Sequence, residues 1–229
     1  MPSDLNVIHA AQLATIKDHG GPRRGARQGD LNLIPDGAVA IRNGHITAVG
    51  PTSDVLHLAG DDVPTIDATG LCVLPGLVEC HSHPMYGSFP DTVNPAWEYV
   101  RRLQGASSNQ LRAEGGGIWS TIRATSESSD KALLDHTTNI YAQILAGGVT
   151  TLEVKSGYGF TLDGELRQLK LLKASASQTP MDIVCTYMGA QFQPQDGTTP
   201  EIYAQAVIDK FLPAVKAQGI AEFQDLCCE

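Results

Sequence analysis

Apolar residues recur along the chain with two different periods, which predict two kinds of segment. Between Val7 and Val73, short apolar runs alternate with polar residues, as is typical of half-exposed β-strands. Further on, such runs alternate with longer stretches that have apolar residues every three or four positions, as in amphipathic helices. This order predicts an α/β fold with a parallel sheet, preceded by a small β-domain.

The small β-domain is predicted over residues 1–70 and the α/β part over residues 71–229. Asn43-Gly44 lies between two alternating runs and is the strongest local signal for a hairpin turn. The Gly/Arg-rich segment 19–30 is predicted to be a loop. Strands of the β-domain are expected over residues 7–13, 38–42, 45–49 and 65–73.

The α/β part has the size of about half a (β/α)8 barrel. A complete barrel takes about 250 residues, and the chain after His83 has room for about four βα units of roughly 35 residues each. Strands are expected over residues 73–80, 150–155, 183–190 and 221–228. Helices are expected over residues 97–103, 116–125, 131–146, 165–176 and 200–217.

The clearest candidate chemistry is a pair of histidines, His81 and His83, at the end of an apolar run. Successive side chains of a strand point to opposite faces, so these two imidazoles point the same way and can bind one metal ion. Two neighbouring histidines can also be ordinary surface residues. Their place at the end of a strand that follows Pro75-Gly76 favours a metal site, because barrel chemistry lies at the carboxyl ends of the strands.

The run LPGLVECHSH that ends at His83 resembles the PGLVDxHxH signature of the amidohydrolase superfamily, whose members are metal-dependent hydrolases built on a (β/α)8 barrel. Three further segments are similar to the imidazolonepropionase family, in that family's order and at about its intervals: GGGIWSTIRAT (115–125), GVTTLEVKSGYG (148–159) and FQDLCCE (223–229). The resemblance implies one bound zinc or iron and hydrolysis of the ring amide of 4-imidazolone-5-propanoate to N-formimidoyl-glutamate, in histidine degradation.

The same resemblance implies that the chain is the first half of such an enzyme. None of its seven histidines lies beyond His136, and the family's remaining metal ligands and catalytic carboxylate would follow Glu229. Catalytic zinc sites use three protein ligands, so the chain alone is expected to be inactive. Possible partners are a complementing C-terminal half or a second copy, since the family usually forms dimers. The alternative is a non-catalytic half-barrel fragment or subunit.

Three substrate-binding residues are predicted. Tyr158 matches the tyrosine of the family's Ser-Gly-Tyr-Gly motif, although it could simply cap a turn. Gln191 stands where the family has a substrate-contacting histidine, and it can exchange hydrogen bonds but cannot carry a positive charge. Arg123 could clamp a carboxylate, although most helix arginines are surface residues. The family's arginine just after the HxH pair has no counterpart here, so another cyclic amide, or a heterocycle that is deaminated, is a second possible substrate.

Composition narrows the class of protein further. A net charge of −9 argues against nucleic acid or an anionic membrane as partner, and no apolar run approaches the roughly 20 residues of a membrane span. The N-terminus lacks the basic start and apolar core of a secretory signal. An odd set of five cysteines without a CxxC pair is typical of reduced thiols. We therefore expect a cytoplasmic protein with a small-molecule substrate. Two residues near the strand ends are expected to have structural roles: Cys80 packs in the core, and Lys155 is structural.

Overall fold

The computed structural model describes residues 4–17, 20–59, 63–87, 95–192 and 197–227. Contacts divide the chain into two compact units, Met1–Pro75 and Gly76–Glu229. Each unit is described below by itself.

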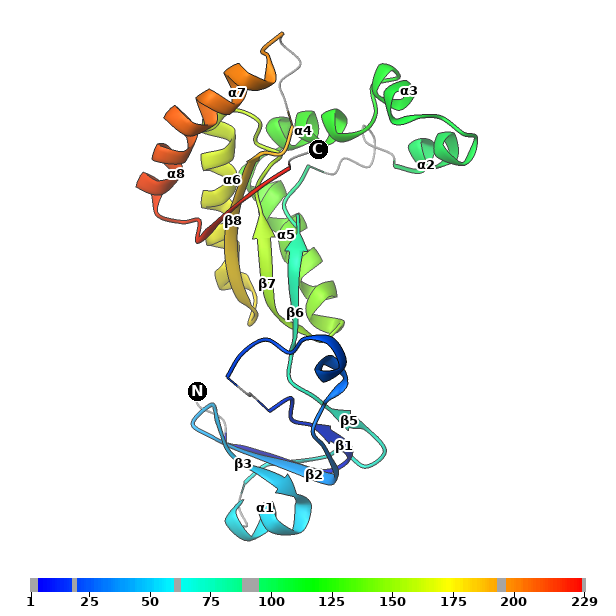
Figure 1. Cartoon of the computed structure of the whole chain (residues 1–229), viewed down its shortest axis with the longest axis vertical. Coiled ribbons are helices and arrows are strands. Elements are labelled where there is room, and N and C mark those ends of the chain that lie inside the picture. The colour runs from blue at the N-terminus through cyan, green and yellow to red at the C-terminus, as the bar shows by residue number, and fades with distance from the viewer. Residues whose placement is uncertain (1–3, 18–19, 60–62, 88–94, 193–196, 228–229) are drawn as a thin grey trace. The chain divides into compact units, whose positions relative to one another are not determined.

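The first unit is a five-stranded sheet in which β1 pairs with three other strands (Figure 1). The strand order is β3-β2-β1-β4, and β5 also pairs with β1. Asn43 and Gly44 have φ angles of 52° and 77°, which fit the predicted hairpin turn between β2 and β3. The elements are β1 (Leu5–Ala14), η1 (Gly25–Gly29), β2 (Leu33–Arg42), β3 (His45–Pro51), α1 (Thr52–Ala59), β4 (Thr65–Asp67) and β5 (Cys72–Val73).

Two features of this unit differ from the sequence prediction. Helix α1 was not predicted, because its eight residues are too few to display a clear helical period. The single strand expected over residues 65–73 is divided into β4 and β5. The Asp67 carboxylate accepts hydrogen bonds from the amide (2.9 Å) and the hydroxyl (2.6 Å) of Thr69. This local turn competes with the strand and interrupts it.

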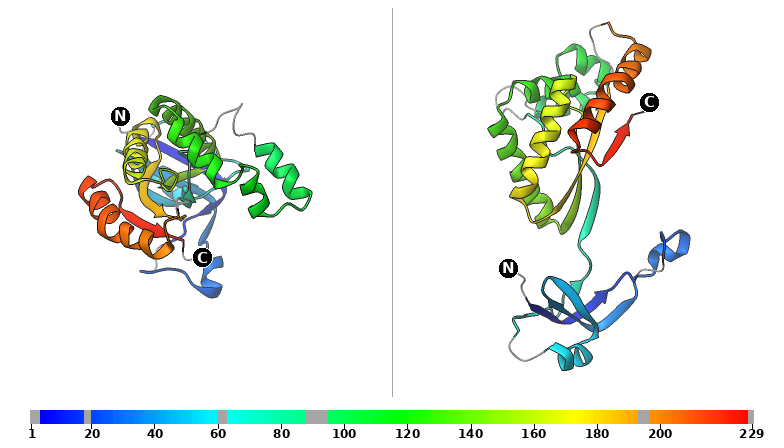
Figure 2. Two further views of the ribbon diagram at one scale, coloured as in Figure 1. Left: turned by 90° about the horizontal axis from the view of Figure 1, so that it is seen from above. Right: turned by 90° about the vertical axis from the view of Figure 1, so that its left-hand side faces the viewer.

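The second unit is a parallel sheet of four strands, in the order β6-β7-β8-β9, with helical connections between them. Helices α5, α6 and α8 lie along one side of this sheet, and α6 lies beside α8 (Figures 1 and 2). This is half of the sheet of a (β/α)8 barrel, as predicted. The elements are β6 (Leu77–Ser82), α2 (Pro95–Leu103), α3 (Ser108–Ala113), α4 (Ile118–Glu127), α5 (Asp130–Ala146), β7 (Val149–Lys155), α6 (Leu162–Ser175), η2 (Ala176–Gln178), β8 (Asp182–Ala190), α7 (Pro200–Ala206), η3 (Val207–Phe211), α8 (Leu212–Gln218) and β9 (Phe223–Leu226).

The long helix expected over residues 200–217 is interrupted by η3, a π-helical turn. Pro213 lies at the start of α8 and has no backbone N–H to donate to the preceding turn. A wider turn accommodates this missing donor. Helix α3, which begins with a Ser107 capping box, was also not predicted.

Cys80 is exposed rather than packed in the core, so that expectation was wrong. Strand β6 is the first strand of the four-stranded sheet, and an edge strand has a neighbour on one side only. The core lies farther along the sheet, where Leu152 and Val154 of β7 pack with Leu172 of α6 and Tyr141 of α5. Within the described part of the chain, no helix is both long enough and apolar enough to cross a membrane.

Candidate active site

The predicted histidine pair lies at the carboxyl end of β6, the first strand of the parallel sheet. His81 is exposed and His83 is half-buried. Their ring centroids are 5.5 Å apart at an interplanar angle of 71°. Both ring nitrogens of His83 are buried, and neither has a hydrogen-bond partner of normal geometry among the described residues. Since buried polar atoms are nearly always paired, these nitrogens fit a ligand such as a metal ion.

The surroundings of His83 favour the form of imidazole that binds metals. Burial lowers the pKa of His83, and the nearby charges of His81 and Lys155 lower it further. The backbone of Ser156 and of Lys155 opposes this effect only in part. The neutral imidazole, which is the metal-binding form, is therefore favoured near neutral pH.

Tyr158 lies directly against His83. The two ring centroids are 5.2 Å apart, with an edge-to-face angle of 76°. Burial raises the pKa of Tyr158, and Tyr86 raises it further, so its hydroxyl keeps its proton and can donate a hydrogen bond at neutral pH. The structure thus places a phenol next to the histidine pair.

Two further aromatic residues line the same region, and the sequence prediction missed both of them in this role. The ring of Tyr86 lies 6.5 Å from that of Tyr158 and 4.7 Å from that of His136. The His136 Nε2 atom is buried and finds no hydrogen-bond partner in the described ranges, and burial lowers the pKa of His136. Because Tyr86 lies in the loop after β6 and His136 on α5, their approach depends on the tertiary fold.

Gln191 follows β8 and reaches the same loop as Tyr158. A Cβ atom built on Gly157 would lie 2.6 Å from the Gln191 Oε1 atom, so a larger residue there would displace the Gln191 side chain. The Gln191 Oε1 atom is buried and has no hydrogen-bond partner within the part of the chain that the structure describes. It is therefore an acceptor available to a ligand.

Arg123 does not join this group. Its side chain is exposed and donates to the Gly115 carbonyl oxygen at 3.3 Å, near the start of its own helix α4. The contacts of the described residues do not bring it to His83 or Tyr158. The predicted anion clamp at Arg123 stays a prediction.

A cluster of ionic side chains joins β7 to β9, and we call it the Lys155 ion cluster (Glu153, Lys155 and Asp225). The Lys155 Nζ atom lies 2.8 Å from Glu153 Oε1 and 2.8 Å from Asp225 Oδ2. Thr186 of β8 donates to Glu153 Oε1 at 2.6 Å. The Lys155 side chain is only 5% exposed, so its charge is matched within the protein.

The pKa values in this cluster favour the charged forms. Burial alone lowers the pKa of Lys155, but the hydrogen bonds to Asp225 and Glu153 outweigh it, so the pKa lies above its usual value. The hydrogen bond from Lys155 lowers the pKa of Asp225. Burial raises the pKa of Glu153, but hydrogen bonds from Lys155 and Thr186 reverse this effect. Sequence reasoning gave Lys155 a structural role without finding Asp225 as its partner.

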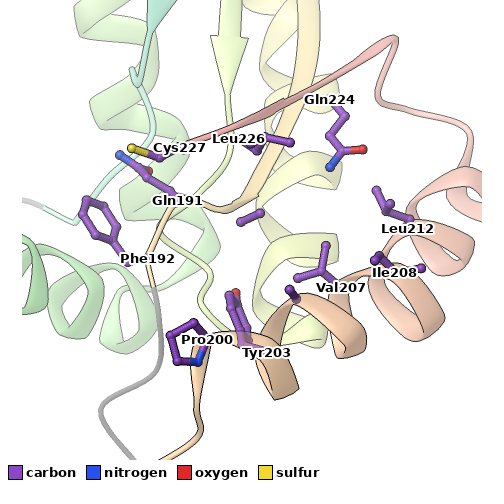
Figure 3. A pocket seen from close by; sticks show the side chains of 12 residues that line it. Gln191, Phe192, Pro200, Tyr203, Val207, Ile208, Leu212, Gln224, Leu226 and Cys227 are labelled. Carbon is purple, nitrogen blue, oxygen red and sulfur yellow. The ribbon is translucent and has the colours of Figure 1, made fainter. Parts of the chain in front are cut away.

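An apolar groove of about 550 Å³ lies between the ends of β8 and β9 and the helical segment that joins them. Figure 3 shows Gln191 and Cys227 at one end of this groove and Leu212 at the other. Its lining is Ala190, Gln191, Phe192, Pro200, Tyr203, Ala204, Val207, Ile208, Leu212, Gln224, Leu226 and Cys227.

The described residues do not form a metal site by themselves. Among them, no group of three or more His, Cys, Asp or Glu side chains could hold an ion. His81 and His83 are two candidate ligands, whereas a catalytic zinc ion uses three protein ligands.

Comparison with known proteins identifies the family. Residues 37–58 match the model of the imidazolonepropionase-like composite domain of bacteria. The imidazolonepropionase of Symbiobacterium thermophilum is 40% identical, over 100% of this chain and 53% of that protein. The imidazolonepropionase of Solibacter usitatus is 39% identical, over 99% of this chain and 53% of that protein. The chain belongs to the imidazolonepropionase family. It spans about half the length of the curated relatives it matches.

Solved structures agree on the fold. A triazine hydrolase from Arthrobacter aurescens superposes with a TM-score of 0.54 at 15% identity, over 98% of this chain and 46% of that chain. Escherichia coli guanine deaminase gives a TM-score of 0.54 at 16% identity, over 90% of this chain and 42% of that chain. At these identities the likeness shows the amidohydrolase fold alone, and it confirms the predicted half-barrel.

Proposed function

We propose that this chain forms part of an enzyme that hydrolyses the ring amide of 4-imidazolone-5-propanoate to N-formimidoyl-glutamate in histidine degradation. The observation that carries the proposal is the 40% identity to an imidazolonepropionase over the full length of the chain. The contact of Tyr158 with His83 at the strand ends supports it.

In this proposal, His81 and His83 hold one divalent ion, zinc or iron. An atrazine chlorohydrolase from Arthrobacter aurescens, 16% identical with a TM-score of 0.50, is solved in complex with zinc and atraton. When bound, such an ion activates water and polarises the ring carbonyl. Burial keeps His83 neutral and ready to bind.

The remaining residues orient the substrate. The Tyr158 hydroxyl donates a hydrogen bond to a ring heteroatom beside His83, because its raised pKa keeps it protonated. The unpaired Gln191 Oε1 atom accepts from a ring N–H. Both groups are neutral, so they orient the ring without taking its proton.

A complementing C-terminal half is the partner we propose for this chain. Strand β9 ends the described sheet, and the side chains of Phe223 and Leu226 on it are 62% and 50% exposed. Unpaired strand edges with exposed apolar side chains are sites for further pairing. A second half would cover this edge and supply the missing metal ligand.

A second candidate function is hydrolysis of a different cyclic amide, or deamination of a heterocycle. Gln191 favours it, because the glutamine cannot pair with a substrate carboxylate as a charged side chain does.

The test is to measure metal content and hydrolysis with this chain alone and with this chain joined to the C-terminal part of the Symbiobacterium thermophilum relative. We expect one ion and ring opening of imidazolone propanoate only in the joined protein. His83→Ala should abolish both, and Lys131→Met on the surface of α5 is the matched control. Faster turnover of a hydantoin or an aminated heterocycle would favour the second candidate, and full metal occupancy of the chain alone would contradict the need for a second half.

A further inference from the structure

Four consecutive backbone amides, from Gly157 to Phe160, are held by two side chains of helix α6. Glu165 accepts hydrogen bonds from Gly157 (3.1 Å), Gly159 (2.8 Å) and Phe160 (3.0 Å). Gln168 accepts one from the amide of Tyr158 at 3.1 Å. We call this arrangement the Glu165 clamp (Glu165 and Gln168 with the loop 157–160).

Both side chains of the clamp are fully inside the protein. Glu165 is 0% exposed and Gln168 is 2% exposed. A buried carboxylate is costly unless it is hydrogen-bonded. Among the described residues, Glu165 is hydrogen-bonded by the backbone N–H groups of the loop and by the Ser156 side chain, and no ion pair with a cation is found for it. The clamp is therefore directed at the loop that carries Tyr158.

The loop needs such support because the backbone of Phe160 is strained. Phe160 is not a glycine, yet its φ is 64°, whereas Gly157 adopts its φ of 116° without such strain. A side-chain-bearing residue persists in such a conformation only when the surrounding structure fixes it. Gly159 also touches Gly164 so closely that a Cβ on either residue would lie within 2.2 Å of the other's backbone.

Gln168 also connects the Tyr158 loop to the loop after the histidine pair. Its Nε2 atom donates to the Met85 carbonyl oxygen at 2.7 Å, across 83 residues of sequence. Met85 lies two residues beyond His83 and is itself buried. One side chain therefore joins the backbone beside Tyr158 to the backbone beside His83.

We infer that Glu165 and Gln168 are positioning residues, which hold the Tyr158 ring against His83 by fixing the backbone of the two loops that carry them. The inference rests on the proposed function only in taking Tyr158 and His83 as residues of the active site. It assigns the placement of Tyr158 to helix α6 and not to the sheet.

The test compares four variants of this chain by hydrogen exchange and by the NMR contact between the rings of Tyr158 and His83. Glu165→Gln keeps the shape but puts an amide donor against the loop N–H groups. Gln168→Met removes both hydrogen bonds of Gln168, whereas Gln168→Glu keeps the acceptor for Tyr158 and loses the donor to Met85. Asp163→Asn, an exposed carboxylate on the same helix, is the matched control.

We expect Glu165→Gln to reduce exchange protection of Gly157, Gly159 and Phe160 by about tenfold or more. Gln168→Met should expose the Tyr158 amide, and Gln168→Glu should restore its protection. Each variant of Glu165 or Gln168 should weaken the ring contact, while β7 and β8 stay protected and Asp163→Asn changes nothing. A contact between the Tyr158 and His83 rings that survives in all three variants of Glu165 and Gln168 would overturn the inference. It would also be overturned if β7 and β8 lost as much exchange protection as the loop, because the two residues would then have a merely structural role.

These measurements need neither metal nor substrate, so they are independent of the proposed reaction. In the joined enzyme, Glu165→Gln should lower kcat/KM for imidazolone propanoate by about tenfold or more at unchanged metal content. Unchanged kcat/KM would overturn the positioning role. A joined enzyme that turns over no imidazolone propanoate would contradict the proposed function and would leave the ring-contact result as the test of the clamp.

Discussion

The Lys155 ion cluster and the Glu165 clamp follow one another at the carboxyl end of β7, and they satisfy charged groups in opposite ways. In the ion cluster, Lys155 meets two carboxylates, and the Asp225 side chain is 38% exposed. In the clamp, Glu165 is 0% exposed and its carboxylate meets backbone amides. The ion cluster stabilises its charges with opposite charges near solvent, and the clamp stabilises its carboxylate with peptide dipoles out of contact with water.

The two groups also differ in how far apart their members lie in the sequence. The Lys155–Asp225 pair spans 70 residues and depends on β9 staying next to β8. The hydrogen bonds of Glu165 reach no more than nine residues back, to Ser156. The site therefore has one part that is set by local chain geometry and one part that is set by closure of the sheet.

The largest expected effect distinguishes the ion cluster from an ordinary surface pair. Lys155→Met would leave Glu153 and Asp225 facing each other without a cation, and breaking a buried pair costs about 3–5 kcal/mol. Since Asp225 is partly exposed, solvent screening reduces this loss to about 2 kcal/mol. Urea unfolding should show this loss, whereas Lys131→Met, which removes an exposed pair with Asp135, should cost under about 0.5 kcal/mol. Equal losses would mean that the cluster adds nothing.

A smaller loss of stability is expected when Thr186 of β8, which donates a hydrogen bond to the cluster, is replaced. Thr186→Val keeps the shape of a fully buried side chain but removes its hydrogen bond to Glu153. Losing a hydrogen bond to a charged group costs about 1.5 kcal/mol. Thr138→Val, whose hydroxyl donates only to the Leu134 carbonyl within its own helix, is the control for urea unfolding. A loss no greater than that of the control would show that Lys155 alone satisfies Glu153.

The smallest expected effect concerns the pH dependence of stability, because the pKa shifts of Asp225 and Glu165 have opposite signs. The pKa of Asp225 is lowered by its bond from Lys155, so its stabilisation is complete above the unfolded value of about 3.9 and is lost as the pH falls through the folded value. Burial raises the pKa of Glu165, against the hydrogen bonds from Ser156 and the loop amides. Its contribution is complete below the unfolded value and is lost as the pH rises through the folded value.

We therefore expect acidification from pH 6 to pH 3 to loosen β9 and to leave the Glu165 clamp as protected as before or more so. Protection factors, corrected for the intrinsic pH dependence of exchange, measure both regions in one experiment. Parallel loosening of Asp225 and of the loop amides would contradict the opposite shifts.

The sequence by itself determined the α/β class and the order of most of the elements, and it suggested chemistry at the strand end that carries His81 and His83. Alternation and helical period are local properties, and they indicated β6 to β9 and the helices between them, as well as the hairpin at Asn43-Gly44. The spacing of His81 and His83 was enough to suggest a metal site, because strand geometry alone fixes the direction of side chains two positions apart.

Only the tertiary structure decided which partners the buried polar groups have. Glu165 begins an amphipathic helix in the sequence, and nothing local indicates that its carboxylate is enclosed by the loop before it. Asp225 and Lys155 meet because parallel strands align their carboxyl ends, and Gln168 meets Met85 because α6 packs against the loop after β6. A buried polar side chain takes whichever partner the packed chain brings within about 3 Å, and sequence periodicity carries no information about that distance.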